Sequence, residues 1–289
     1  MSDYWRESRE ITERIVVEGD LVLLTPASLG NGDADGLTDM SLLLDEFEGK
    51  ALLTGTSIAG ALRNYLRECS LNYGISEESK YKDEKRESVN VPLPIITQIF
   101  GSLEDDGAQS LLIVDDAIGG VPRTELRDGV KIDGKMRTAE DGKKFDLELL
   151  EAGTSFPLRF ELLICEQKGK DAEERKRKTE EFKTDLLKAF AAALQGFETG
   201  EIHLGARKRR GYGECEIKKW RVKTFKLCGD QDGLIDWLKN GAKPLSGSGI
   251  AEQTSIAAAL KVSPIADRRE YFEMNACFAL EGSMLIRSG

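Results

Sequence analysis

A helix, a basic loop and a strand follow one another in FKTDLLKAFAAALQGFETGEIHLGARKRRGYGECEIKKWRVKTF, residues 182–225. Apolar residues recur at helical spacing in the first part, so we expect a helix from about Glu173 to Phe197 with one apolar face. Apolar and polar residues alternate over 214–225, which is typical of a strand. The loop between them, GARKRRGYG at 205–213, has four consecutive cations flanked by glycines. This composition favours phosphate binding, because glycine lets the backbone approach a ligand and the cations neutralise its charge.

The alternative for this loop is a solvated turn whose cations balance nearby acids. The chain as a whole has a formal net charge of -10 and a pI near 5.0, which argues against a protein that coats nucleic acid through a broad positive field. Any contact with phosphates is therefore expected to be local. Tyr212, inside the loop, could stack on a base or a ribose.

Upstream of this stretch the sequence predicts three more strands, another helix and a hairpin. The strands are expected at 14–26, 110–116 and 155–165, the helix within 52–69 and the protruding hairpin at 123–145. Thr56 or Ser57 is available as the N-cap of the helix. The order strand, helix, strand, hairpin, strand, helix, strand predicts an α+β fold of the ferredoxin-like (RRM-like) type, with four antiparallel strands and two helices on one face.

The C-terminal part of the chain predicts a linker and the start of a repeat. Residues 229–273 include GAKPLSGSG, a composition typical of linkers, so we expect the first domain to end at residue 228. The pattern of VVEGDLVLL near the start returns in ALEGSMLIRSG at the end. We therefore expect residues 274–289 to begin a second copy of the fold.

The inventory of reactive side chains excludes several kinds of chemistry. The five cysteines are scattered and form no CxxC pair, and His203 is the single histidine. A ribonuclease that relies on two histidines and a multi-histidine metal centre are thereby excluded. Acid-base catalysis would have to come from carboxylates, lysines or metal-bound water. No apolar run is long enough for a membrane span, and we expect a cytoplasmic protein.

An acidic loop, NGDADGLTD at 31–39, has the opening pattern of a calcium-binding EF-hand loop. Leu42 stands where that motif needs a bidentate glutamate, and a strand precedes the loop instead of a helix, so we do not expect an EF-hand. Two alternatives remain for these carboxylates. They bind a hard cation in another way, or one of them lies near a scissile phosphate.

Five motifs in order, spread over residues 14–222, resemble the RAMP superfamily of CRISPR-associated proteins. The basic loop is similar to the glycine-rich loop of that family, and LLTGTSIAGALRNYL (52–66) is similar to its glycine-serine helix segment, with Thr54 where proline is usual. The other three matches are QIFGS (98–102), LLIVDDA (111–117) and VKIDGKMRTAEDGKKFDLE (130–148), where Gly134 replaces an arginine.

The resemblance is strongest to the repeated backbone subunit of type III interference complexes. That subunit lies along the guide RNA and inserts a thumb-like hairpin into it, and the resemblance implies that the hairpin at 123–145 is this thumb. It implies as partners a guide RNA, a complementary target RNA and other subunits, with no membrane contact. It also implies a target-cleaving aspartate in the loop before the first helix, here Asp39, with Asp33 and Asp35 as the next choices and Mg²⁺ or Mn²⁺ as the cofactor, held in part by Asp39. The chain would then be an endoribonuclease, and the leading part of a fused subunit.

The resemblance and the basic loop together give a set of candidate RNA-binding residues. They are Gly55, Ser57, Arg63, Gly205, Arg207, Lys208, Arg209, Arg210, Gly211, Tyr212 and Gly213. Two other functions stay open. One is a scaffold subunit that binds RNA without cutting it, and the other is a guide-processing nuclease of the same family, which ranks last because it usually needs a histidine early in the chain.

Overall fold

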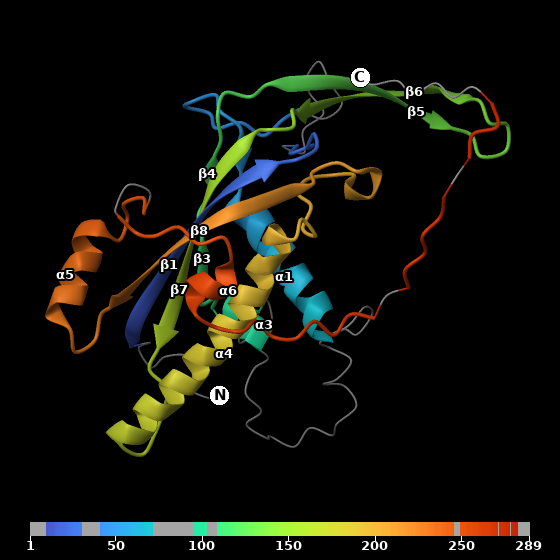
Figure 1. Ribbon diagram of the computed structural model, residues 1–289. Helices are drawn as coiled ribbons and strands as arrows, with labels where there is room; N and C mark the ends of the chain where they lie inside the picture. The colour runs from blue at the N-terminus through green and yellow to red at the C-terminus, as the bar shows by residue number, and fades with distance from the viewer. Residues whose placement is uncertain are drawn as a thin grey trace, which may run out of the picture.

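The structure, a computed structural model, describes residues 10–30, 41–71, 95–102, 109–245, 249–270, 272–277 and 279–282. These residues form a mixed α/β architecture around one antiparallel four-stranded sheet (Figure 1). The strand order is β3-β7-β1-β8. The strands are β1 (Ile11–Leu23), β3 (Leu112–Val114), β7 (Ser155–Cys165) and β8 (Cys215–Lys226).

Strand β1 lies in the middle of the sheet and fixes its register. Val17 is opposite Phe160 of β7 and Val222 of β8. Because side chains alternate along a strand, Ile15 and Val17 point to one face of the sheet while Val16 points to the other. Both faces of β1 are covered by apolar groups, since all three residues are buried.

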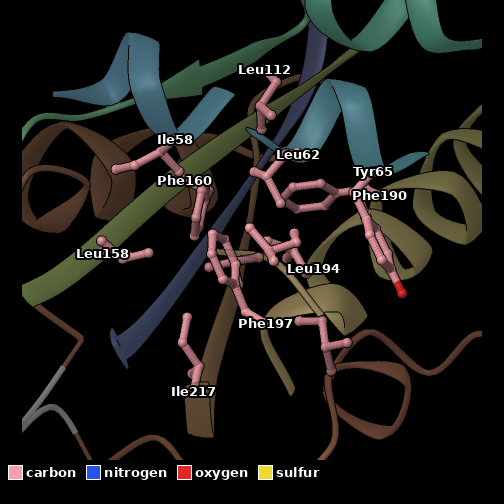
Figure 2. Close-up of a cluster of buried hydrophobic side chains, with 14 of the residues drawn as sticks. Ile58, Leu62, Tyr65, Leu112, Leu158, Phe160, Phe190, Leu194, Phe197 and Ile217 are labelled. Carbon is pink, nitrogen blue, oxygen red and sulfur yellow. The ribbon is translucent and has the colours of Figure 1, made fainter. Parts of the chain in front are cut away.

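The main core lies between one face of this sheet and the helices α1 (Gly55–Leu71), α3 (Ile95–Phe100) and α4 (Ala172–Glu198). Figure 2 shows side chains of α1, α4 and the strands meeting there, among them Phe160 and Phe190. Their rings meet edge to face with centroids 6.1 Å apart. The Asp171 side chain caps α4 by accepting from Glu174 N at 2.8 Å, which explains where this long helix begins.

The opposite face of the sheet is covered by the stretch that follows β8. Helix α5 (Gln231–Asn240) supplies Trp237, which packs on Val16 and Phe225, and the guanidinium of Arg14 lies 4.3 Å from the centroid of the Trp237 ring. The chain then returns to the first face, where α6 (Ile256–Leu260) packs against α4. Residues 229–273, predicted as a linker, thus contain two helices that pack on the sheet and on α4.

Two small sheets complete the described fold. Strands β2 (Leu52–Leu53) and β4 (Ala117–Ile118) form one, and β5 (Thr124–Ile132) and β6 (Ala139–Leu150) form the predicted hairpin. The hairpin projects from the end of the sheet at which β8 begins (Figure 1).

The predicted strands and long helices agree with the observed ones, but several short elements were not predicted. These are β2, β4, α3, α5 and α6. The helix N-cap is Thr54, whose hydroxyl accepts from Ser57 N at 3.3 Å, and not Thr56 or Ser57. In the expected second copy, 274–277 and 279–282 form no helix or strand, and residues 283–289 lie outside the described part, so the repeat stays a prediction.

Candidate nucleic-acid interface

The basic loop is a closed turn whose ends are bonded to each other. Leu204 N donates to Gly213 O at 2.8 Å, and a short 3-10 turn, Lys208–Arg210, forms the tip. At Gly213 the backbone φ is +74°, and a Cβ there would lie 1.8 Å from Leu204 O. At Gly205 a Cβ would lie 2.4 Å from Ser28 O. These two glycines are therefore needed for close contact between backbone segments, in addition to any approach of a ligand.

The loop is fixed to the chain that leaves strand β1. Ala206 N donates to Ser28 O at 2.9 Å, and Gly213 N donates to Pro26 O at 2.9 Å. Residues 27 and 150 form a bridge at the same place, so the base of the hairpin is attached to the same segment. The loop, the end of β1 and the hairpin thus form one connected region.

Two predicted RNA-binding residues make contacts with the hairpin. The guanidinium of Arg207 lies 4.2 Å from the centroid of the Phe145 ring. The guanidinium of Arg127 lies 5.7 Å from the centroid of the Tyr212 ring. Phe145 is paired with Gly129 across the hairpin, where a Cβ would come within 2.1 Å of the ring, so the ring has room to lie across the strand pair. Arg207 and Tyr212 therefore join the loop to the hairpin.

The remaining cations at the tip are exposed. Lys208, Arg209 and Arg210 are all exposed, and none of them forms an ion pair with a residue that the structure describes. Gly211, next to them, has a φ of +81° with open space where a Cβ would stand. Three exposed positive charges without an acidic partner in the described ranges, on a well-anchored turn, are a suitable arrangement for binding successive phosphates.

The start of α1 holds the other candidate residues. Gly55 N donates to Asp116 Oδ1 at 2.7 Å, and a Cβ on Gly55 would lie 2.2 Å from Val114 O, so glycine permits the close contact with β3. The Ser57 hydroxyl accepts from Thr54 Oγ1 at 2.9 Å. Arg63 is half-exposed in the next turn, and no ion pair joins it to the described residues.

The acidic residues Asp33, Asp35 and Asp39 lie outside the described residues. The two residues that flank their segment, Gly30 and Leu42, form a bridge, and Leu43 N donates to Leu29 O at 2.8 Å. Both flanks are close to the basic loop, because a Cβ on Gly205 would meet the Leu29 side chain at 3.1 Å. Within the described ranges, no three His, Cys, Asp or Glu side chains gather in a group that could hold a metal ion.

Sequence reasoning missed the hairpin residues of this region. Phe145 is the one aromatic residue among the charged residues 123–148, and that isolation was a usable signal. Arg127 carried no comparable signal, because the same hairpin contains many other charges. His203, which the sequence left without a role, forms a bridge with Glu214 at the root of the basic loop.

The chain matches a known protein family. The family model of the RAMP superfamily matches residues 20–216, which include the end of β1, both long helices and the basic loop. No curated protein shows significant sequence similarity to the chain. In the part of the chain that the structure describes, no helix combines the length and apolar character needed to cross a membrane. The match covers well over half of the chain and the whole of the connected region described above, and the chain belongs to the RAMP superfamily of CRISPR-associated RNA-binding proteins.

Proposed function

We propose that the chain is a guide-RNA-binding backbone subunit of a type III CRISPR effector complex. The observation that carries this proposal is the tip of the basic loop, where Lys208, Arg209 and Arg210 are exposed without acidic partners among the described residues. The loop is hydrogen-bonded to the chain that leaves β1, and Arg207 stacks on Phe145 of the hairpin, so the position of these charges is fixed. An RNA backbone bound there would continue along the hairpin.

The topology supports the same proposal. The order β3-β7-β1-β8, with α1 between β1 and β3 and α4 between β7 and β8, is the order expected of a ferredoxin-like domain. The face of the sheet opposite α1 and α4 is covered by α5 and the residues that follow it. RNA binding in this chain is therefore assigned to the basic loop and the hairpin, and not to that face of the sheet.

The test compares two triple variants of the full chain that each remove three consecutive cations. Lys208, Arg209 and Arg210 are replaced by Ala in one, and Lys176, Arg177 and Lys178 in the other, about 30 Å away along α4 by the rise of a helix. We expect the first variant to bind single-stranded RNA more weakly, with a salt dependence less steep by about 2 in the log-log slope. The α4 variant should retain the wild-type slope. Equal slopes in both variants would contradict the assignment.

We further propose that the complex cuts target RNA with the help of Asp39, on the basis of the family resemblance. Asp39, with Asp33 and Asp35 near it in the sequence, offers oxygen ligands of the kind that Mg²⁺ and Mn²⁺ prefer. A bound ion would supply positive charge at the scissile phosphate. The carboxylate of Asp39 would hold this ion or position the neighbouring 2′-hydroxyl for in-line attack on the phosphorus, so that the bond to the 5′-oxygen breaks and the products are a 2′,3′-cyclic phosphate and a 5′-hydroxyl.

The cleavage proposal is tested in the assembled complex with guide RNA, end-labelled complementary RNA and Mg²⁺. We expect Asp39→Asn to remove one specific cut while guide binding is unchanged. Asp33→Asn and Asp35→Asn test the next choices for the catalytic residue, because they change the same type of side chain in the same segment. If all three variants cut like the wild type, the chain is a scaffold subunit that does not cleave.

A further inference from the structure

A cavity of about 280 Å³ lies between the middle of α1 and the segment that enters the basic loop. Its lining residues are Ala61, Asn64, Tyr65, Glu68, Glu201, Ile202, His203, Lys208 and Arg209. Two of these residues, Lys208 and Arg209, belong to the tip of the basic loop that we assign to phosphate binding. The cavity and the proposed phosphate site therefore share a border.

The floor of the cavity is apolar. A Cβ on Gly196 of α4 would lie 2.7 Å from Ile202 and 2.8 Å from the Tyr65 ring, so both side chains are packed closely on that helix. Figure 2 shows Tyr65 at the margin of the buried cluster with its hydroxyl directed away from it. Burial raises the pKa of Tyr65, so the hydroxyl keeps its proton and can donate a hydrogen bond. Tyr65 and Ile202 are 9% and 4% exposed, so each presents only a small apolar edge to the cavity.

The walls of the cavity are polar, and Arg269 neutralises the charge of one of their two carboxylates, Glu201. Glu201 forms an ion pair of 2.6 Å with Arg269, whose guanidinium also lies 5.0 Å from the centroid of the Tyr65 ring. Glu68, on the facing wall, forms no ion pair with a described residue. Beside it, the Asn64 amide can both donate and accept hydrogen bonds. The cavity thus combines an acceptor wall with a cationic mouth formed by Lys208 and Arg209.

We propose that this cavity receives one unpaired nucleotide of the RNA and prefers a base that carries an exocyclic amino group. The amino group of the base donates to Glu68, and the phosphate lies against Lys208 and Arg209. This inference rests on the proposed RNA-binding function and adds a base preference to it. An arrangement of exposed cations alone would bind every base equally, because all nucleotides carry the same phosphate.

Cytosine and uracil provide the sharpest comparison. They have the same size and similar stacking surfaces, but cytosine presents an amino donor where uracil presents a carbonyl acceptor. The carboxylate of Glu68 would accept from cytosine and would repel the uracil oxygen. One well-formed contact of this kind corresponds to discrimination of about tenfold.

The experiment measures the binding of the full chain to fluorescent oligo(C) and oligo(U) of equal length by anisotropy. We expect oligo(C) to bind about tenfold more tightly than oligo(U). Glu68→Ala removes the acceptor, and Ala61→Phe fills the cavity, so each should bring the two affinities to within about twofold by lowering that for oligo(C). The control Glu46→Ala removes an equally charged, exposed side chain in the turn before β2 and should keep the preference.

The possible results distinguish a failure of the nucleotide site from a failure of RNA binding. Equal binding of oligo(C) and oligo(U) by the wild type overturns the nucleotide site while leaving RNA binding intact. A preference that survives in both Glu68→Ala and Ala61→Phe overturns it as well. If neither oligonucleotide binds, the RNA-binding function itself fails. Glu68→Ala changes a partly exposed side chain, so the test does not depend on the folding of the cavity-filling variant.

Discussion

The guanidinium of Arg207 lies 4.2 Å from the centroid of the Phe145 ring, which connects the basic loop to the hairpin between residues separated by 62 positions in the sequence (207 − 145). This contact uses one of the four consecutive cations to hold the loop in place. The other three are exposed and form no ion pair with a described residue. A loop that is fixed before RNA arrives loses less conformational entropy on binding than a free one.

The first prediction concerns the free energy of this contact. In a double-mutant cycle with Arg207→Ala and Phe145→Leu, unfolding in urea should give a coupling free energy of about 0.5–1 kcal/mol, the usual size for an exposed cation-π pair. The same cycle with Arg209→Ala in place of Arg207→Ala is the control. Arg209 does not contact Phe145, so its coupling should be near zero, and comparable couplings in the two cycles would mean that the stacking contributes nothing specific.

The second prediction concerns the glycines of the basic loop. Gly213→Ala places a Cβ 1.8 Å from Leu204 O and forces an alanine into a left-handed backbone conformation, so we expect a loss of stability of more than about 2 kcal/mol. Gly211→Ala has the same backbone strain but open space around the new atom, and it should cost only about 1–2 kcal/mol. Urea denaturation of both variants provides the comparison. Equal losses would show that the close approach to Leu204 is relieved without cost.

The third prediction concerns the ion pair on the face of the sheet covered by α5. Glu18 is buried, pairs with Arg159 and accepts from Leu245 N at 2.8 Å, while Arg159 also donates to Gly241 O. Arg159→Met leaves the Glu18 carboxylate buried without its partner, and we expect a loss of about 3 kcal/mol in the free energy of unfolding.

The matched variant adds Glu18→Gln to Arg159→Met. It removes the uncompensated charge and keeps an acceptor for Leu245 N, so it should recover part of the lost stability. Limited proteolysis after residue 228 would report whether α5 and the following chain detach in the single variant. A double variant no more stable than Arg159→Met would argue that the lost packing of Arg159, and not the unpaired charge, is the cause.

The fourth prediction concerns the cysteines. Cys69, Cys165 and Cys215 are buried, and burial raises the pKa of Cys215 to about 12. Cys228 and Cys277 are exposed. Because the thiolate is the reactive form, the native chain at pH 8 should react quickly with Ellman's reagent at two thiols, and at all five after unfolding.

The two exposed thiols should also differ from each other. The Sγ of Cys228 lies 3.2 Å from Glu10 Oε1, and this carboxylate raises the pKa of Cys228. A smaller thiolate fraction at pH 8 makes its reaction slower than that of Cys277. The variant Cys228→Ser should therefore lose the slower of the two native phases, and loss of the faster phase would contradict this assignment.

Much of the fold followed from local patterns. The strand at 155–165 and the helix from about 173 to 197 were predicted almost at their observed bounds, because alternation and helical spacing are properties of short segments. Helix α5 was hidden because its stretch is short, polar and followed by glycine and serine. Its one large anchor, Trp237, has a role only after Val16 and Phe225 are placed on the same face of the sheet.

By itself, the sequence determined the fold class, the hairpin and the basic loop, since each depends on residues that are close together in the chain. Only the tertiary structure decided that Arg207 stacks on Phe145, that Gly205 and Gly213 serve contacts between backbone segments, and that Tyr65 and Glu68 share a cavity with His203. These relationships join residues from different elements. Their distances depend on how the sheet, α1 and α4 pack together, and no pattern along the chain contains that information.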